Sequence, residues 1–546
     1  MPPSPAVASL ESMLLDDLSV ELGWTLIERF STLVRESGSE DERAAADHIA
    51  AELERLGIEH EVYEPRLYLS LPRESWVEAG GERFRAKPPS FASPTGAEGL
   101  VAELIHVPAE RMRGMDDLFA ARHGPAAPEV AGKIVLTEGY AMPLTVQRFE
   151  RAGALGQIYT NPGDRVHWGI CTPIWGTPTT RNLADKPSTP VLAVSRPDGE
   201  RLRMLATRGP RRATLHARLE EGWAPCKLPV ARIRGESDAF FLAHGHYDSW
   251  DVGIGDNAVG DAALLEIARL FHAHRDRLPR SLWIAWWPGH STGRYAGSTW
   301  FADRFALELR KRCVGALNID SPGCWHATAY EDVQWMAEAE SLCRGAIRDA
   351  AGAEATGHRP LRAGDYSFDQ IGLTSFFMLL SSIPKEERET LGFYPTGGCG
   401  GNIAWHTEAD TREVADRETL ARDLQVYVTA LARVLAPPIL PYDFRATTAE
   451  LGGFVDGYRE TAGDRLDLAV VEEERAVLAR ELDALYAALE SAEPRGPAAR
   501  AVDEAHVELG RILVPIGYAA GERFDHDPAL PRPGIPRLAG VRSLDT

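Results

Sequence analysis

Residue types that bind divalent metal ions stand at the ends of three apolar segments. His246 closes the run Phe-Phe-Leu-Ala-His-Gly-His, His290 comes three residues after 281–287, and Asp320 follows 314–319. Apolar runs that end in polar residues before a helical pattern are typical of strand, loop and helix. In an open α/β sheet the loops after the strands meet in one crevice, so we expect these side chains to converge. Imidazole and carboxylate groups together there would bind a metal ion.

Further candidates lie near these segments. Asp248 is two residues beyond His246, and Asp256 stands at the start of a helical pattern. His406 lies in the segment Trp-His-Thr-Glu-Ala-Asp, which ends at Asp410. A single histidine in a chain with 16 of them is more often structural than a ligand. Several metal-binding residue types in order at strand ends favour a metal site over coincidence.

The order of these residues resembles the zinc aminopeptidase family that includes glutamate carboxypeptidase II and the transferrin receptor. The family pattern has a His-x-Asp, a further Asp, a Glu-Glu pair after the next strand, another Asp and a last His. Four of these elements are matched here, by His246-Tyr247-Asp248, Asp256, Asp320 and His406. The resemblance covers nearly the whole chain, and its specific motifs lie between residues 240 and 411.

The chain departs from this pattern at the Glu-Glu pair. When 280–287 is aligned with the family's preceding strand, His290 takes the position of the general base and Ser291 that of a metal-binding carboxylate. Serine is a neutral, weak oxygen donor, so either a second ion is absent or His290 binds it. An imidazole, with an unperturbed pKa of about 6.5, is also a suitable base. We therefore interpret His290 as base, ligand, or a hydrogen-bonding residue of an inactive site.

The resemblance implies a role for each matching residue. His246 and Asp320 would hold one ion, and Asp256 would bridge it to a second ion at His406. The implied cofactor is a divalent metal, zinc by family default, with one or two ions per chain. Asp248 would orient His246 through its other ring nitrogen. No other cofactor-binding residue is predicted.

Two roles remain around the last histidine. Asp410 would orient His406 as Asp248 orients its partner. Family members commonly carry a tyrosine directly before this histidine, where it donates to the oxyanion, but this chain has Trp405. Tyr366, or alternatively Tyr394, would then supply the catalytic hydroxyl.

The predicted fold class is α/β, with a mixed-sheet, three-layer zinc-peptidase domain, an inserted protease-associated β-rich domain and a C-terminal helical domain. The predicted ranges are 1–89 for the N-terminal part of the peptidase-like domain, 90–222 for the insert, 223–440 for the metallopeptidase-like catalytic domain and 441–546 for the helices. The insert resembles a family domain that helps to cover the substrate. Its aromatic stretch makes Trp168 and Trp175 candidate lid residues, and a packed turn is the alternative.

The C-terminal segment shows two amphipathic helical patterns. One has leucines from Leu478 to Leu489 on a single stripe, and the other runs from Val502 to Leu513. Apolar helix faces need partners. Similar helices build the homodimer of the family members named above, so the resemblance implies a homodimer through this segment.

Composition restricts the partners and the compartment. The 59 Lys and Arg against 80 Asp and Glu leave a net charge of −21, which argues against nucleic acid and anionic membranes. Six cysteines without paired spacing indicate free thiols. The N-terminus lacks a basic stretch before an apolar one, and no apolar run is long enough to span a bilayer. We expect a cytoplasmic protein that acts on a small-molecule or short-peptide substrate.

The main functional hypothesis is a metal-dependent hydrolase of an amide-type bond in a small peptide or an N-acylated amino acid. One alternative is a non-hydrolytic metal-dependent enzyme on the same scaffold, a C–N lyase in which His290 removes a carbon-bound proton. The other is a non-catalytic, receptor-like or scaffold homologue. The presence of His246, Asp256, Asp320 and His406 argues against this last possibility.

Overall fold

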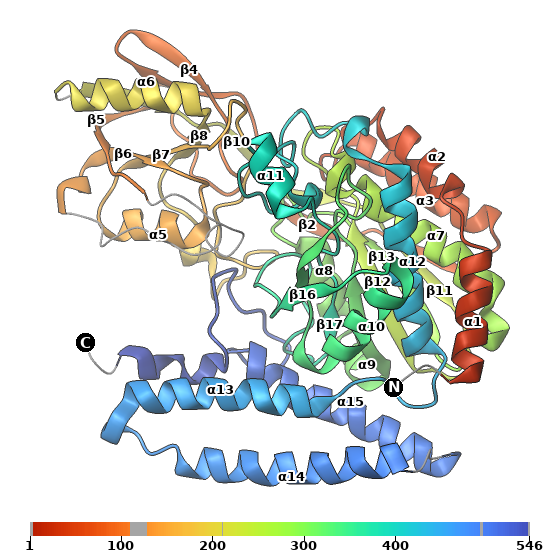
Figure 1. Cartoon of the computed structure of the whole chain (residues 1–546). Coiled ribbons are helices and arrows are strands. Elements are labelled where there is room, and N and C mark those ends of the chain that lie inside the picture. Colours follow the sequence, from red (N-terminus) through yellow and green to blue (C-terminus); the bar gives the residue numbers. More distant parts are fainter. Residues whose placement is uncertain (1–3, 110–127, 210, 492–494, 544–546) are drawn as a thin grey trace.

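The computed structural model describes residues 4–109, 128–209, 211–491 and 495–543. It is a mixed α/β protein with a central mixed sheet, a second mixed sheet and C-terminal helices (Figure 1). The predicted α/β class is confirmed at this level. No helix in the described ranges has both the length and the apolar character needed to cross a membrane.

The central sheet has six strands in the order β1-β11-β13-β12-β14-β17. Their bounds are β1 His60–Tyr63, β11 Leu228–Ile233, β12 Phe240–His246, β13 Ser281–Trp287, β14 Cys313–Asn318 and β17 Ser375–Phe376. The pairs β12/β13, β12/β14 and β14/β17 are parallel, and β11 and β1 join antiparallel at one edge. The strands that carry the predicted site residues are therefore parallel neighbours, and their carboxyl ends meet at one edge.

The central strands are buried on both faces, which explains their continuous apolar runs. Phe241 and Ala243 of β12 face one core cluster, and Phe240 and Leu242 face another. The first cluster is completed by helices α1 Pro5–Asp16, α2 Glu21–Phe30, α3 Glu40–Arg55, α7 Val259–Ala273, α10 Glu340–Ala351 and α12 Arg417–Leu435. The second is completed by α8 Ala296–Arg304 and α9 Ala306–Arg312. Helices and side chains therefore pack on both faces of the strands whose ends lead to the predicted site residues.

The second sheet has seven strands in the order β4-β3-β9-β5-β6-β7-β8. Their bounds are β3 Ser75–Ala79, β4 Glu82–Ala86, β5 Leu100–His106, β6 Lys133–Glu138, β7 Gly156–Thr160, β8 Val191–Val194 and β9 Arg211–His216. Helices α5 Pro143–Arg151 and α6 Arg196–Thr207 pack on it through Phe149 and Leu202. Because β3 and β4 belong to this sheet, it begins at Ser75, before the predicted boundary at residue 90. The ribbon of β2 Arg66–Pro72 and β10 Leu219–Pro225 connects it to the rest of the chain.

Three long helices, α13 Phe444–Ala462, α14 Ala469–Ser491 and α15 Pro497–Tyr518, lie together below the central sheet in Figure 1. The predicted leucine stripe lies on α14, where Leu482 is buried and Leu478 and Leu489 pack at its margin. The smaller elements are β15 Tyr330–Gln334, β16 Ala355–His358 and α11 Lys385–Leu391. All six cysteines are buried free thiols.

Candidate metal centre

Three predicted side chains converge beyond the ends of β12, β13 and β14. His246, His290 and Asp320 offer one ligand atom each, and these atoms all lie within 4.8 Å of one another. The rings of His246 and His290 stack with their centroids 3.7 Å apart and 14° between their planes. The convergence expected from the strand ends is therefore present in the structure.

Asp256 lies between two histidines that are far apart in the chain. Its Oδ1 is 2.9 Å from Nε2 of His246, and its Oδ2 is 3.1 Å from Nε2 of His406. Nε2 of His246 also lies 3.7 Å from Oδ2 of Asp320. The two oxygens of Asp256 thus face two separate imidazoles, the arrangement that a bridging carboxylate needs.

The three histidines of the centre are oriented in the same way, through Nδ1. His246 donates to the backbone oxygen of Asp248 at 3.0 Å, His290 to Oδ2 of Asp365 at 2.8 Å, and His406 to the backbone oxygen of Trp168 at 3.0 Å. An acceptor at Nδ1 selects the tautomer whose lone pair is on Nε2. In each of the three rings Nδ1 is therefore occupied and Nε2 is left for the centre.

The donor set fits a divalent metal ion. Nε2 of His246 is buried and, within the described residues, makes no well-directed hydrogen bond, although Asp256 and Asp320 lie close to it. Burial alone would lower the pKa of His246, but the carboxylates of Asp248, Asp256 and Asp320 outweigh it and raise that pKa well above its usual range. A lone pair that faces carboxylates needs a cation between them, either a proton or a metal. Two imidazoles and a carboxylate are a common zinc ligand set.

Asp248 fixes both histidine-bearing loops. Its backbone oxygen orients His246, and its carboxylate accepts the N–H groups of His290 at 3.1 Å and Ser291 at 3.0 Å. The hydroxyl of Ser37 donates to the same carboxylate at 2.7 Å. Burial raises the pKa of Asp248, but His246, His290 and Ser37 outweigh it and the net shift is downward. The orienting role predicted for Asp248 is thus exercised mainly through its backbone oxygen.

Asp410 has different partners from the one predicted. Its carboxylate accepts the N–H groups of Gly255 at 2.6 Å and Asp256 at 3.0 Å, and the thiol of Cys399 lies 3.5 Å away. His406 is oriented instead by the carbonyl of Trp168. Burial, reinforced by the charge of Asp256, raises the pKa of Asp410 to about 7. Asp410 therefore positions the backbone of the bridging aspartate.

The two candidate lid tryptophans occupy different environments. Trp168 lines the cavity, stacks on Trp250 with centroids 5.4 Å apart, and donates from Nε1 to Asp251 at 2.9 Å. Trp175 is buried; its ring centroid is 4.2 Å from that of Tyr295, and its Nε1 donates to a serine hydroxyl behind the site. Trp168 thus borders the centre, whereas Trp175 is a packed residue, as the alternative interpretation of that stretch expects.

Tyr366 does not supply a hydroxyl to the cavity. Its phenol oxygen is buried and accepts the N–H of Met378 at 3.3 Å. Tyr394 contacts Nε2 of His167 at 2.9 Å. The tyrosines that line the cavity are Tyr140 and Tyr295. The prediction of Tyr366 as the catalytic hydroxyl was wrong, because its phenol oxygen is buried against the backbone of Met378 and does not line the cavity.

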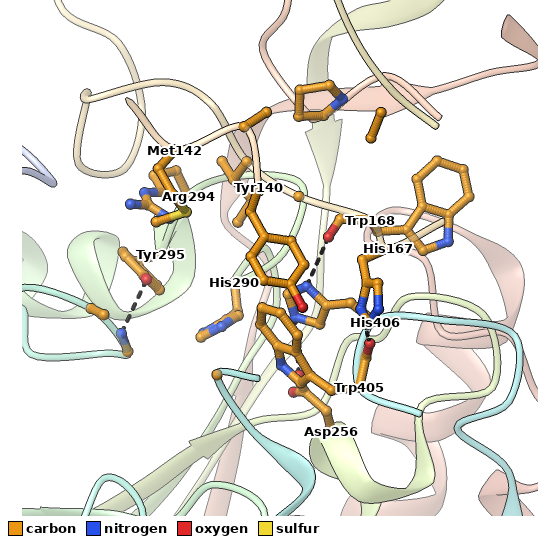
Figure 2. A pocket seen from close by; sticks show the side chains of 18 of the residues that line it. Tyr140, Met142, His167, Trp168, Asp256, His290, Arg294, Tyr295, Trp405 and His406 are labelled. Carbon is orange, nitrogen blue, oxygen red and sulfur yellow. Dashed lines mark hydrogen bonds and ion pairs between the residues drawn. The ribbon is translucent and has the colours of Figure 1, made fainter. Parts of the chain in front are cut away.

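The cavity opens to solvent, and about 840 Å³ of space free of protein atoms lies in and in front of it. Its lining combines Asp256, His290, Asp320 and His406 with aromatic residues and one guanidinium, that of Arg294, and Figure 2 shows several of them. Three residues around it were absent from the sequence prediction, namely Asp365, Arg294 and Tyr295. Arg294 and Tyr295 follow His290 closely in the sequence, and only this proximity could have suggested them. Asp365 lies 75 residues after His290, and no motif around it indicates a role in the site.

Comparison with known proteins gives a consistent picture. Residues 230–430 match the model of Peptidase family M28. Among solved structures, the aminopeptidase from Aneurinibacillus sp. strain AM-1 is 18% identical, with 78% of this chain and 96% of that chain covered and a TM-score of 0.57. The zinc aminopeptidase BSAP from Bacillus subtilis is 18% identical, with 77% and 95% covered and a TM-score of 0.58.

A Peptidase M28 precursor from Shewanella amazonensis is 20% identical, with 79% of this chain and 96% of that chain covered and a TM-score of 0.55. At identities of 18 to 20%, these structural matches show a similar fold and do not establish a shared function. No curated protein matches the chain.

Proposed function

We propose, on the premise that residues 230–430 are a Peptidase family M28 domain, that this chain is a metal-dependent hydrolase of an amide-type bond in a small peptide or an N-acylated amino acid. The observation that carries the proposal is the placement of His246, His290 and Asp320, whose ligand atoms lie within 4.8 Å of one another beside an open cavity. The family match and the resemblance in fold to a zinc aminopeptidase support zinc as the metal.

A zinc ion at this position would polarise the substrate carbonyl and lower the pKa of a bound water. His246, His290 and Asp320 would hold it, and three protein ligands leave an open coordination position. His290 is better suited to be a ligand than a free base. Asp365 occupies its Nδ1, and its ring is stacked against His246 so that both Nε2 atoms serve the same centre.

Asp256 and His406 are placed to handle protons. Oδ2 of Asp256 lies 3.1 Å from Nε2 of His406, whose Nδ1–H is already donated to Trp168. We infer that Asp256 accepts the proton of the attacking water and passes it to Nε2 of His406, and that His406 then delivers this proton to the leaving nitrogen. Were a second ion held between them, both residues would be ligands instead.

Metal analysis joined to an activity assay tests this assignment. We expect one equivalent of zinc per chain in the wild type and in His406→Ala, loss of the ion in Asp320→Ala, and loss of turnover in both variants. Two equivalents, with one lost in His406→Ala, would instead support a co-catalytic pair. Failure to bind metal even after reconstitution would reject the hydrolase and favour the non-catalytic alternative.

The products separate hydrolysis from elimination. In heavy-oxygen water, hydrolysis places the label in the new carboxylate, because the attacking oxygen comes from solvent. A C–N lyase would leave an unsaturated product without label. We expect the labelled carboxylate from a panel of dipeptides and N-acylated amino acids.

A further inference from the structure

Arg294 is a buried cation that has no hydrogen-bond or ion-pair partner among the residues that the structure describes. It is 4% exposed, and its Nε is buried with no hydrogen-bond partner. Across the described ranges the guanidinium forms no ion pair and donates no hydrogen bond; its closest described interaction is with the ring of Tyr295, 4.9 Å from Cζ. Burying a charge without a partner is costly, so a protein that retains one needs a reason outside its own packing.

The other buried arginines show what a structural guanidinium looks like in this fold. Each of them donates to at least two protein acceptors. Arg35 donates to the backbone oxygens of Tyr247, Val252 and Gly253, and Arg280 donates to those of Val434 and Pro438 and to the carboxylate of Asp503. Arg362 donates to the backbone oxygens of Tyr366 and Asp527, and Arg511 to those of Arg310, Gly372 and Leu309. Arg511 is as buried as Arg294, at 4% exposure. Burial therefore does not explain why Arg294 lacks partners.

Arg294 lines the same cavity as His290 and Asp320. Figure 2 shows Arg294 and Tyr295 on one side of His290, with His406 on the other side. The backbone holds this position: the carbonyl of Arg294 accepts the N–H of Gly176 at 2.6 Å, and the N–H of Tyr295 donates to the carbonyl of His290 at 3.1 Å. Both Arg294 and Tyr295 have positive φ, 51° and 68°, a conformation that costs free energy and is found at functional sites.

The chemistry of the cavity selects the ligand. Arg294 is the only lysine or arginine among the described lining residues, and Asp256 and Asp320 lie in the same cavity. A single guanidinium fork matches a planar monoanion with two oxygens, which is a carboxylate. A phosphate dianion would be repelled by the two aspartates more strongly than a carboxylate, because it carries twice the charge.

We propose that Arg294 binds the free carboxylate of the substrate's amino-acid half. The substrates would then be N-acylated amino acids or dipeptides that end in a free acid next to the cleaved bond. This inference rests on the proposed hydrolase for the position of the bond, but not for the binding of the carboxylate.

Matched free acids and amides test the assignment. The probes are N-acetyl-L-alanine, N-acetyl-L-methionine and N-acetyl-L-phenylalanine, each beside its carboxamide, with binding measured by calorimetry and hydrolysis by kcat/KM. We expect the wild type to prefer the acids, and Arg294→Met to lose roughly 10- to 100-fold for the acids with little change for the amides. Arg294→Lys should be intermediate, because it keeps the charge and loses the fork. Equal acid and amide affinity in the wild type, or an acid preference that survives in Arg294→Met, would overturn the proposal.

A stability measurement separates this role from a structural one. Without ligand, Arg294→Met should unfold at a temperature equal to or above that of the wild type, since an unpaired buried charge is removed. Arg511→Met is the matched control and should be less stable, because it leaves backbone carbonyls unpaired. A marked loss of stability in Arg294→Met would mean that the guanidinium supports the fold, against the proposal. If no probe is hydrolysed but the acids still bind through Arg294, the hydrolase fails and the carboxylate site stands.

Discussion

Nδ1 of His290 donates to Oδ2 of Asp365 at 2.8 Å, a contact between residues 75 positions apart in the chain. The second oxygen of Asp365 accepts the hydroxyl of Ser298 at 2.6 Å. Burial raises the pKa of Asp365, but His290 and Ser298 outweigh it, so the net shift is downward and favours the carboxylate. An anchored carboxylate behind a histidine fixes the ring and makes Nε2 a stronger ligand. His290 is thus held as a metal ligand is held.

This contact predicts the effect of Asp365→Asn. The amide can present its N–H₂ to His290 and so allow the wrong tautomer, which places a proton on Nε2. We expect zinc affinity to fall roughly 10- to 100-fold with the fold intact. Competition with a zinc chelator measures it. Ser298→Ala is the control, because it removes the other side-chain contact of Asp365 and leaves the contact with His290 in place. An effect as large as that of Asp365→Asn would count against the tautomer argument.

A second prediction contrasts His290, in the loop after β13, with His244 on the neighbouring strand β12. His290→Ala should lose the metal ion, because it removes one of three ligands. His244→Ala should keep the ion. Nδ1 of His244 accepts the indole N–H of Trp287 at 3.0 Å, and burial lowers its pKa to about 4, so it is a neutral core residue. Metal content per chain after dialysis distinguishes them. If His290→Ala keeps the metal ion, His290 is not a ligand, and the interpretation of His290 as the base would be favoured.

A third prediction concerns pH and a carboxylate away from the centre. Asp423 is buried on α12 and accepts the N–H of Gly323, the hydroxyl of Ser381 and the phenol of Tyr330. Burial raises the pKa of Asp423 to about 6 despite these bonds. Because its folded pKa is raised, its contribution to stability is complete below the unfolded value near 3.8 and is lost as pH rises through about 6.

Asp423→Asn removes this titration. Its unfolding free energy relative to the wild type should be constant below about pH 4 and rise through about pH 6, by up to about 3 kcal/mol. Urea unfolding of both proteins at a series of pH values measures the difference, and other titrating groups cancel. If the difference in unfolding free energy between the two proteins does not change with pH across this range, burial does not raise the pKa of Asp423.

The homodimer inferred from the C-terminal helices remains a prediction. Ile512 and Ile516 of α15 are 55% and 44% exposed, and residues four apart lie on one helix face. We expect a dimer by light scattering, and a monomer for Ile512→Asp/Ile516→Asp. The control is Leu307→Asp, which charges an equally apolar but separate exposed position, 76% exposed on α9. A wild-type monomer at micromolar concentration would contradict the prediction.

Much of the architecture could be predicted from local patterns. Continuous apolar runs such as 281–287 indicate strands buried on both faces, and polar residues directly after them mark the edge where side chains meet. This is why His246, His290 and Asp320 could be grouped from the sequence. The second sheet also contains β3 and β4, which precede the predicted insert at 90–222. Local patterns could not show this, because β4 pairs with β3 and β3 pairs with β9, far along the chain.

The partners of the site residues could not be predicted in the same way. Asp410 was expected beside His406 because the two are close in sequence, yet it binds the backbone before Asp256. Asp365 and the carbonyl of Trp168, which orient two of the histidines, come from loops with no motif of their own.

Residue type and strand periodicity are local properties, so they identify which side chains can bind metal and at which sheet edge they gather. Which nitrogen of each histidine is free, and which buried charge lacks a partner, depend on contacts between segments that only folding brings together. Arg294 is chemically the same as Arg511 in the sequence. The two differ because packing surrounds one with carbonyl oxygens and leaves the other facing the cavity.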